Sequence, residues 1–206
     1  MIGLSLLLVG CQPAAPRYLA QPQQIEVVGD WRHDPSGMVF PAVVAGFNRV
    51  DIAHFSATKP DVAAAYNLSG AHGPIAATVY IAPAMELFTV GMATDAVAAA
   101  RDRACGVDFD GQKRDILYHT MARTLAQKNV ALRKNGRLRP GRQAIFAYQA
   151  VFAGQRQNLQ TELDGFCFAT DDWSIEFRFT YPETMAAEGR IAGFLQALPW
   201  TGQIAD

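Results

Sequence analysis

The densest group of side chains suited to binding a ligand is a run of cations. Five of them fall within ten residues: Arg133, Lys134, Arg137, Arg139 and Arg142. No Asp or Glu occurs from residue 116 to residue 161. Guanidinium and ammonium groups bind phosphates and carboxylates. Two interpretations remain open, a site for a lipid phosphate or an acidic partner, and a solvated hairpin that stays soluble through its charge.

The histidines and serines give no comparable pattern. His33, His54, His72 and His119 are scattered, and no pair has the helical i,i+4 spacing or the spacing of metal ligands. Ser69 lies close to His72, but the chain has no Gly-x-Ser-x-Gly nucleophile motif. The sequence therefore predicts no catalytic residue, no metal and no cofactor. Aromatic residues are not interleaved with the cations, which argues against nucleic acid as a partner.

The start of the chain carries chemistry of another kind. Residues 1–10 are an apolar run that ends at Cys11, and Leu8-Val9-Gly10-Cys11 resembles the lipobox of bacterial lipoproteins. That resemblance implies cleavage before Cys11, followed by acylation of its thiol and its new amino group. Residues 11–24 are rich in Pro, Gln and Ala and read as an extended tether. With Gln12 after the cysteine, the resemblance implies an outer-membrane location, facing the periplasm.

Two further cysteines, Cys105 and Cys167, remain once Cys11 is assigned to the lipid. An even number of thiols in an oxidising compartment is compatible with a disulfide. Cys105 lies on the apolar stripe of a long predicted helix, and Cys167 faces away from Phe166 and Phe168 on a predicted strand. If the helix covers that face, the two sulfurs meet. The alternative is a pair of buried free thiols.

The elements that position these residues follow from periodicity. From Trp173 to Tyr181 apolar and polar residues alternate, which predicts a strand with one buried face. A two-residue turn at Asp171-Asp172 would place Phe168 opposite Ile175. Thr94-Asp95 is a suitable start for a long helix. The spacing of Ile191, Phe194, Leu195 and Leu198 predicts a C-terminal amphipathic helix.

Length and composition support one domain over residues 25–206. Half of the residues are hydrophobic, which is enough for a full core. The element order predicts an α+β fold, with one antiparallel sheet of six to seven strands and helices on its faces. This order, with the aromatic last strand running into Tyr181-Pro182 and a closing helix, resembles the α/β/α sandwich of the photosystem II extrinsic-subunit P and Ran-binding import-factor superfamily. The resemblance implies an accessory binding or assembly role without catalysis.

The sequence therefore predicts a lipid-anchored protein of the bacterial cell envelope. Its domain is expected to bind or scaffold an envelope protein partner at the membrane, without chemistry of its own. The formal net charge of −1 gives no general attraction to nucleic acid. Two alternatives stay open: an envelope hydrolase whose site has no recognised motif, and a small-ligand carrier with an apolar pocket between sheet and helix. The partner and the oligomeric state do not follow from the sequence.

Overall fold

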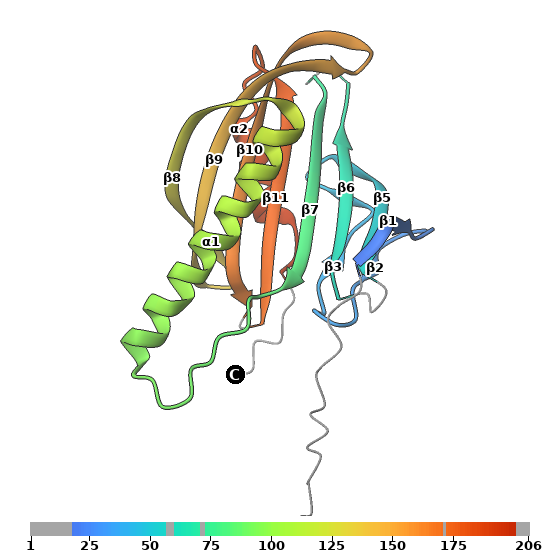
Figure 1. Cartoon of the computed structure of the whole chain (residues 1–206). Coiled ribbons are helices and arrows are strands. Elements are labelled where there is room, and N and C mark those ends of the chain that lie inside the picture. Colours follow the sequence, from blue (N-terminus) through green and yellow to red (C-terminus); the bar gives the residue numbers. More distant parts are fainter. Residues whose placement is uncertain (1–17, 57–59, 71–72, 171, 201–206) are drawn as a thin grey trace, which may run out of the picture.

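The fold is organised around one large antiparallel sheet (Figure 1). The structure is a computed structural model, and it describes residues 18–56, 60–70, 73–170 and 172–200. Within this part of the chain the main sheet has nine strands in the order β1-β5-β6-β7-β11-β10-β9-β8, with β4 paired to β5. Their bounds are β1 Tyr18–Gln24, β4 Val43–Val44, β5 Phe47–Ser56, β6 Val62–Leu68, β7 Ile75–Pro83, β8 Arg123–Lys134, β9 Arg137–Phe152, β10 Gln155–Thr170 and β11 Trp173–Pro182. A separate hairpin pairs β2 (Trp31–Arg32) with β3 (Val39–Phe40).

Strand β11 lies in the middle of this sheet, between β7 and β10, and forms the centre of the core. Its residues Ile175, Phe177, Phe179 and Tyr181 are all buried on one face. This is the alternation that the sequence predicts, because successive side chains of a strand point to opposite faces. The short helix α2 (Glu188–Ala197) covers that face.

Helix α2 is held by aromatic packing. The Phe194 ring lies 4.9 Å from the ring centroid of Phe47, 5.2 Å from that of Tyr66 and 5.5 Å from that of Phe179, each in an edge-to-face arrangement. Such pairs add about 0.5–1.5 kcal/mol each beyond the area they bury. The C-terminal amphipathic helix that the sequence predicts is therefore present, from Glu188 to Ala197.

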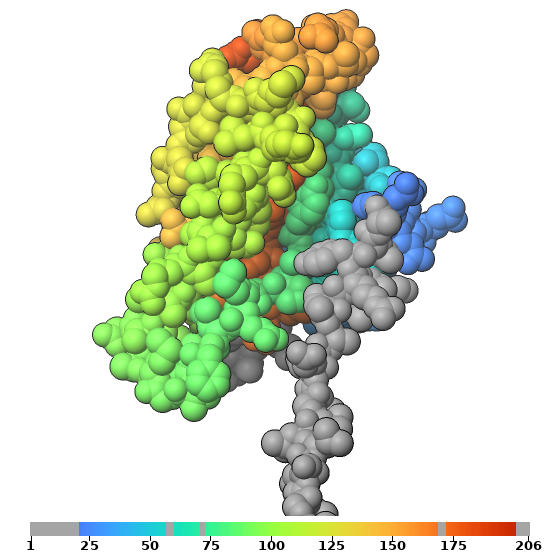
Figure 2. Space-filling model, in the orientation of Figure 1, coloured from blue at the N-terminus to red at the C-terminus, as the bar shows by residue number. Residues whose placement is uncertain are grey.

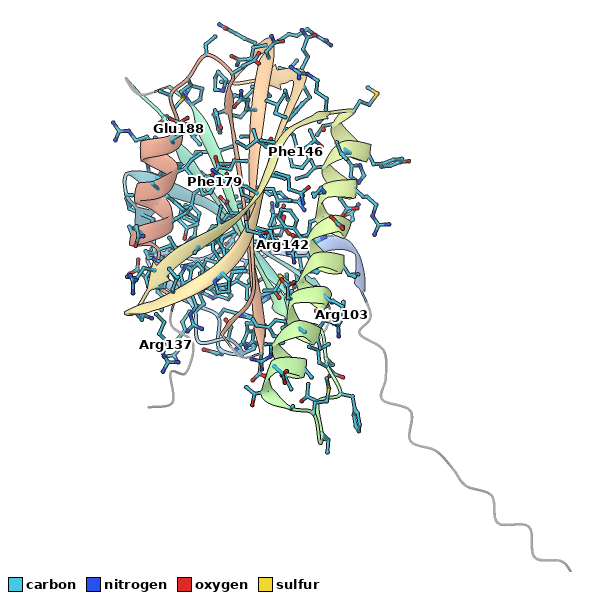
Figure 3. The ribbon with its side chains drawn as sticks, turned by 90° about the vertical axis from the view of Figure 1, so that its left-hand side faces the viewer. Arg103, Arg137, Arg142, Phe146, Phe179 and Glu188 are labelled. Carbon is cyan, nitrogen blue, oxygen red and sulfur yellow. A yellow bond between two sulfur atoms is a disulfide. The ribbon has the colours of Figure 1, made fainter. Side chains whose placement is uncertain are left out.

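Helix α1 (Thr94–Thr120) crosses the opposite face of the sheet (Figures 1 and 3). Only three of its 27 residues are buried, namely Ala104, Phe109 and Ile116. Phe109 and Ile116 pack in a small cluster with Phe146 and Leu163 of β9 and β10. A helix with so narrow an apolar stripe gains little from burial, so other links must hold it to the sheet.

The expectation of an α/β/α sandwich with six to seven strands is wrong. The sheet has nine strands, two helices account for all the α-helix of the described residues, and strand is the dominant structure. Residues 18–24, which the sequence places in the tether, instead form β1. On the face that carries α1, β5 and β6 present Ala53, Ala63 and Ala65 beside an open hollow. Since these small side chains need little cover, no second helix is required there.

A second difference concerns the register of the central hairpin. The turn after Thr170 has the predicted length, because Thr170 pairs with Trp173, but Phe166 and not Phe168 lies opposite Ile175. An irregularity between Phe166 and Thr170 absorbs two residues, and Phe168 has a φ of +50°. That left-handed conformation is strained for a bulky residue. It moves Phe168 out of the aromatic core.

One substitution tests the close packing of α1 on the sheet. A Cβ added at Gly165 would lie 2.8 Å from the buried ring of Phe109. To relieve this clash, α1 would have to shift away from the sheet and lose the contact. We expect Gly165→Ala to lower the free energy of unfolding by about 1–3 kcal/mol. In Gly111→Ala, the nearest atom is 4.0 Å away, and we expect a gain of up to about 1 kcal/mol.

Denaturant unfolding followed by circular dichroism measures both effects. The paired design separates close packing from helix propensity, because both variants add the same methyl group. A neutral or stabilising Gly165→Ala would show that α1 does not rest on β10 in the way described.

Candidate functional site

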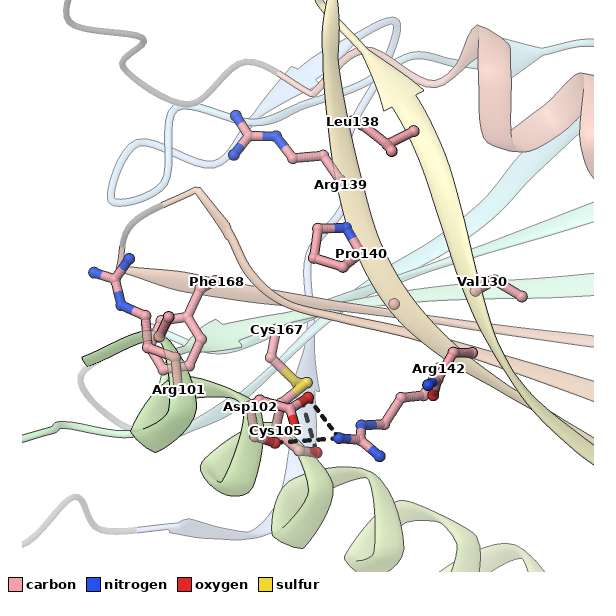
Figure 4. A pocket seen from close by; sticks show the side chains of 13 residues that line it. Arg101, Asp102, Cys105, Val130, Leu138, Arg139, Pro140, Arg142, Cys167 and Phe168 are labelled. Atoms are coloured by element: carbon pink, nitrogen blue, oxygen red, sulfur yellow. Dashed lines mark hydrogen bonds and ion pairs between the residues drawn. A yellow bond between two sulfur atoms is a disulfide. The ribbon is translucent and has the colours of Figure 1, made fainter. Parts of the chain in front are cut away.

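A cleft opens between α1, the β8–β9 hairpin and the end of β10 (Figure 4). Its volume is about 360 Å³, within the ordinary range for ligand pockets. The apolar part of its lining includes Val130, Leu138, Pro140 and Phe168. Segments distant in sequence meet here, so the shape depends on how α1 is fixed to the sheet.

The cysteines of α1 and β10 form one wall of the cleft. Cys105 and Cys167 have their sulfurs 2.13 Å apart and their Cα atoms 5.5 Å apart, and 62 residues of sequence separate them. The structure thus places the two sulfurs at bonding distance, the pairing that the sequence leaves open. Both residues are partly exposed, so this disulfide is accessible from the cleft and not enclosed in the core.

An ion pair crosses the same gap. The Arg142 guanidinium on β9 donates to the Asp102 carboxylate at 2.7 Å and to the Asp102 carbonyl oxygen at 3.2 Å. The Asp102 side chain is 76% exposed, so solvent screens the pair and its contribution to stability is at most about 1 kcal/mol. Its main effect is to place a guanidinium beside the disulfide with its charge already balanced.

The other charged groups of the cleft are cations at its edge. The Arg101 guanidinium lies 5.1 Å above the ring of Phe168, a cation–π contact that the unusual backbone of Phe168 makes possible. Arg139 lines the cleft from β9. Apolar walls with guanidinium groups around them suit a ligand that carries an apolar body and a negative charge.

The cations of the predicted anion site do not converge. Arg139 and Arg142 line the cleft, while Arg137 lies at the hairpin tip, away from α1 (Figure 3). Arg133 donates to the carbonyl of Gly136. Lys134 is buried and serves the structure, as described next. Strand alternation contributes to this, because it places Arg142 on the opposite face of β9 from Arg137 and Arg139.

Lys134 closes the C-terminal end of α2. Its ammonium donates to the carbonyl oxygens of Gln196 and Leu198, and it lies 5.7 Å from the centroid of the Trp200 ring. Burial lowers the pKa of Lys134 to about 8, so the group still carries its charge at neutral pH. A cation at this position is favourable because it balances the helix dipole.

A buried pair of carboxyl groups lies on the α2 face of the sheet, and it was not predicted from the sequence. Glu162 and Asp164 are only 7% and 1% exposed. The side-chain amide of Gln143 donates to both, at 2.8 and 2.9 Å. Burial and the neighbouring carboxylate raise the pKa of Glu162 to about 8, and burial raises the pKa of Asp164. The sequence did contain a signal for this pair. Glu162, Asp164 and Phe166 follow one another at i,i+2 spacing, so they share one face of the strand.

Two histidines that the sequence leaves scattered come together near the start of β11. The rings of His33 and His54 lie 6.3 Å apart, and Trp173 packs on His33 at 5.5 Å. His33 Nδ1 is 2.7 Å from Ser36 Oγ, which also accepts the amide of Met38. Both members of this His–Ser contact are buried within a turn, so it presents no accessible nucleophile. Ser69 lies just after β6, whereas His72 lies outside the described residues.

Cys11 and the lipobox lie outside the described residues. No helix in the described ranges is both long and apolar enough to cross a membrane. Residues 18–56, 60–70, 73–170 and 172–200 contain no cluster of three metal-ligating side chains.

No protein-family model matches this chain, and no curated protein matches it at a significant level.

Proposed function

We propose that this chain is a lipid-anchored protein of the bacterial cell envelope whose domain binds a protein partner. The binding site is the cleft between α1 and the β8–β9 hairpin. The group that it takes is an acidic side chain or carboxylate next to an apolar residue. The observation that carries the proposal is the composition of the cleft, in which Leu138, Val130 and Phe168 form apolar walls beside Arg139 and Arg142.

The size and the chemistry of the cleft support a binding role. A volume of about 360 Å³ accommodates a few side chains of a partner segment. Guanidinium groups form charge-assisted hydrogen bonds with carboxylates, and Arg142 can exchange its exposed partner Asp102 for a ligand. The hydrolase alternative requires an accessible nucleophile beside a base, and the His33–Ser36 contact is buried. No observation favours it, or the carrier alternative, over the binding role.

The anchor is tested by the intact mass of the protein purified from its own membranes. We expect a mass that begins at Cys11 and includes added acyl chains. Multiple acyl chains are required for stable anchoring, since one chain gives only marginal affinity for a bilayer. An unprocessed mass without acyl groups would remove the envelope assignment.

The cleft is tested with a probe that combines an apolar body with an anion. Anilinonaphthalene sulfonate has two ring systems and one sulfonate, and its fluorescence rises in an apolar site. We expect Arg139→Ala to weaken its binding about 5–10-fold, which corresponds to roughly 1–1.4 kcal/mol. Arg137→Ala is the matched control, because it removes the same charge from the same hairpin outside the cleft.

Equal binding by the two variants would show that the probe does not use the cleft, and the proposed site would have to be abandoned. A photo-crosslinking residue at Leu138, which is 60% exposed, then addresses the partner in intact cells. We expect Arg139→Ala to reduce the yield of crosslinked partner and Arg137→Ala to leave it unchanged.

A further inference from the structure

The loop between β7 and α1 exposes an unusual number of apolar side chains. Over residues 84–93, Phe88 is 88% exposed, Val90 81%, Met85 48% and Met92 38%. In Figure 2 this loop and the start of α1 form the green projection at the lower left. Single exposed apolar residues need no explanation, but several together on one loop mark a surface that binds something apolar.

The loop lies at the end of the sheet where the described chain begins. In the ladders, Tyr18 pairs with Ser56, His54 pairs with Val62, and Val62 pairs with Ile81. The first residue of β1 and the last residues of β7 therefore lie at the same end of the sheet. Figure 1 agrees, since β7 runs down into the loop at the end where β1 begins.

The length of chain before β1 limits how far this end can lie from a lipid anchor. Cys11 precedes Tyr18 by seven residues. At ~3.3–3.6 Å per residue, even a fully extended segment spans only about 25 Å. This is shorter than a tether that runs to residue 24 would allow. A chain acylated at Cys11 would therefore hold the loop close to the lipid headgroups.

The charges at this end are mixed. Arg137 lies at the tip of the β8–β9 hairpin at this end (Figure 3), while Glu86, Asp95 and Asp172 are carboxylates of the loop, the start of α1 and the turn before β11. With both signs present, electrostatic attraction to anionic lipid is not the main contribution. The apolar side chains are therefore the groups that select the surface.

We infer that the loop of residues 84–93 inserts its apolar side chains into the membrane that anchors the chain, with Phe88 and Val90 as its deepest members. This inference rests on the proposed lipid anchor. It adds a second membrane contact, which would hold the end of the sheet that carries this loop, together with the start of α1, toward the bilayer. The loop therefore binds a lipid surface. Binding to a protein instead is the alternative that the measurements distinguish.

The insertion is measured with an environment-sensitive NBD fluorophore on single introduced cysteines, Phe88→Cys and Val151→Cys. Val151 is the matched control, because it is 68% exposed and lies near the β9–β10 turn at the opposite end of the sheet. The acylated chain is placed in vesicles of phosphatidylethanolamine and phosphatidylglycerol. We expect a blue shift, and quenching by nitroxide-labelled lipid, at position 88 and not at position 151. A water-like spectrum at both positions would overturn the inference and leave the anchor intact.

A second measurement does not depend on the anchor. The full chain carrying Cys11→Ser cannot be acylated, and we expect it to bind the same vesicles weakly in sedimentation. Adding Phe88→Ser and Val90→Ser should reduce that binding at least 10-fold, while adding Val151→Ser should leave it unchanged. Either of two results would overturn the inference. One is an equal loss of vesicle binding in both variants. The other is a blue shift of the fluorophore that occurs only when membrane proteins are present and not with lipid alone. A missing acyl group in the mass spectrum is a separate result that affects the anchor only.

Discussion

Replacing Cys105 and Cys167 by alanine is expected to lower the free energy of unfolding by about 4 kcal/mol. The bond closes a loop of 62 residues, and the entropy that such a crosslink removes from the unfolded chain corresponds to about 4 kcal/mol. Differential scanning calorimetry of the oxidised protein and the double variant measures the difference. A loss below about 1 kcal/mol would contradict this role for the disulfide.

The same change should loosen α1 far more than the sheet. The helix buries only Ala104, Phe109 and Ile116, and its ion pair through Asp102 is exposed to solvent. Local opening costs little where few apolar contacts hold an element. We expect amides of residues 100–112 to exchange faster by a factor of about 10² or more in the double alanine variant, while amides of β11 keep their protection. In the proposed function, the probe then loses affinity, because the cleft loses one wall.

Helix α2 provides the internal control for this experiment. It has no covalent link to the sheet, and its packing through Phe194 does not depend on the cysteines. Equal acceleration of exchange in both helices would indicate global unfolding and not release of α1.

The substitution Glu162→Gln is expected to raise the free energy of unfolding at pH 8 by about 3 kcal/mol. Folding raises the pKa of the Glu162 carboxyl from 4.5 to about 8, chiefly through burial and then through the nearby Asp164. A pKa that differs by one between the folded and the unfolded states corresponds to about 1.4 kcal/mol, and the full value is reduced because the chain can relax around the charge. Glutamine keeps the size of the side chain and its acceptor for Gln143, and it never ionises.

The wild-type protein should accordingly lose stability as the pH rises. Below pH 4.5 Glu162 is protonated in both the folded and the unfolded states, and its contribution is fully present. Between pH 4.5 and about 8 the unfolded chain releases this proton while the folded chain keeps it, so the free energy of unfolding falls. Burial also raises the pKa values of Asp164, Glu176 and Asp108, and these groups act in the same direction.

Urea unfolding at pH 5, 6, 7 and 8 measures this dependence. We expect Glu162→Gln to flatten the profile. Glu188→Gln is the comparison variant, because Glu188 is an exposed acid at the start of α2 whose charge makes only the smallest contribution to the raised pKa of Glu162; it should flatten the profile much less than Glu162→Gln. Lys128 lowers the pKa of Glu162, so Lys128→Gln should steepen the decline. A wild-type protein that is equally stable at pH 5 and pH 8 would show that the pair is not protonated as described.

The sequence by itself determined the features that depend on neighbouring residues. The alternation from Trp173 to Tyr181 predicted β11, and the apolar spacing around Phe194 predicted the face of α2. These predictions succeeded because a buried strand or helix must repeat its apolar residues with the period of its own backbone. The anchor at Cys11 also depends on a local motif, and it stays a prediction.

Only the tertiary structure decided which residues meet. Nine strands replaced the expected six to seven because short segments such as β4 and the end of the expected tether gain their structure from pairing with β5. Contacts between distant segments also decide two details of β10. One is the irregularity that turns Phe168 into the cleft. The other is the burial of Glu162 and Asp164 together, where both accept hydrogen bonds from Gln143. Five cations within ten residues looked like one site in the sequence, but the pleat places Arg142 on the opposite face of β9 from Arg137 and Arg139.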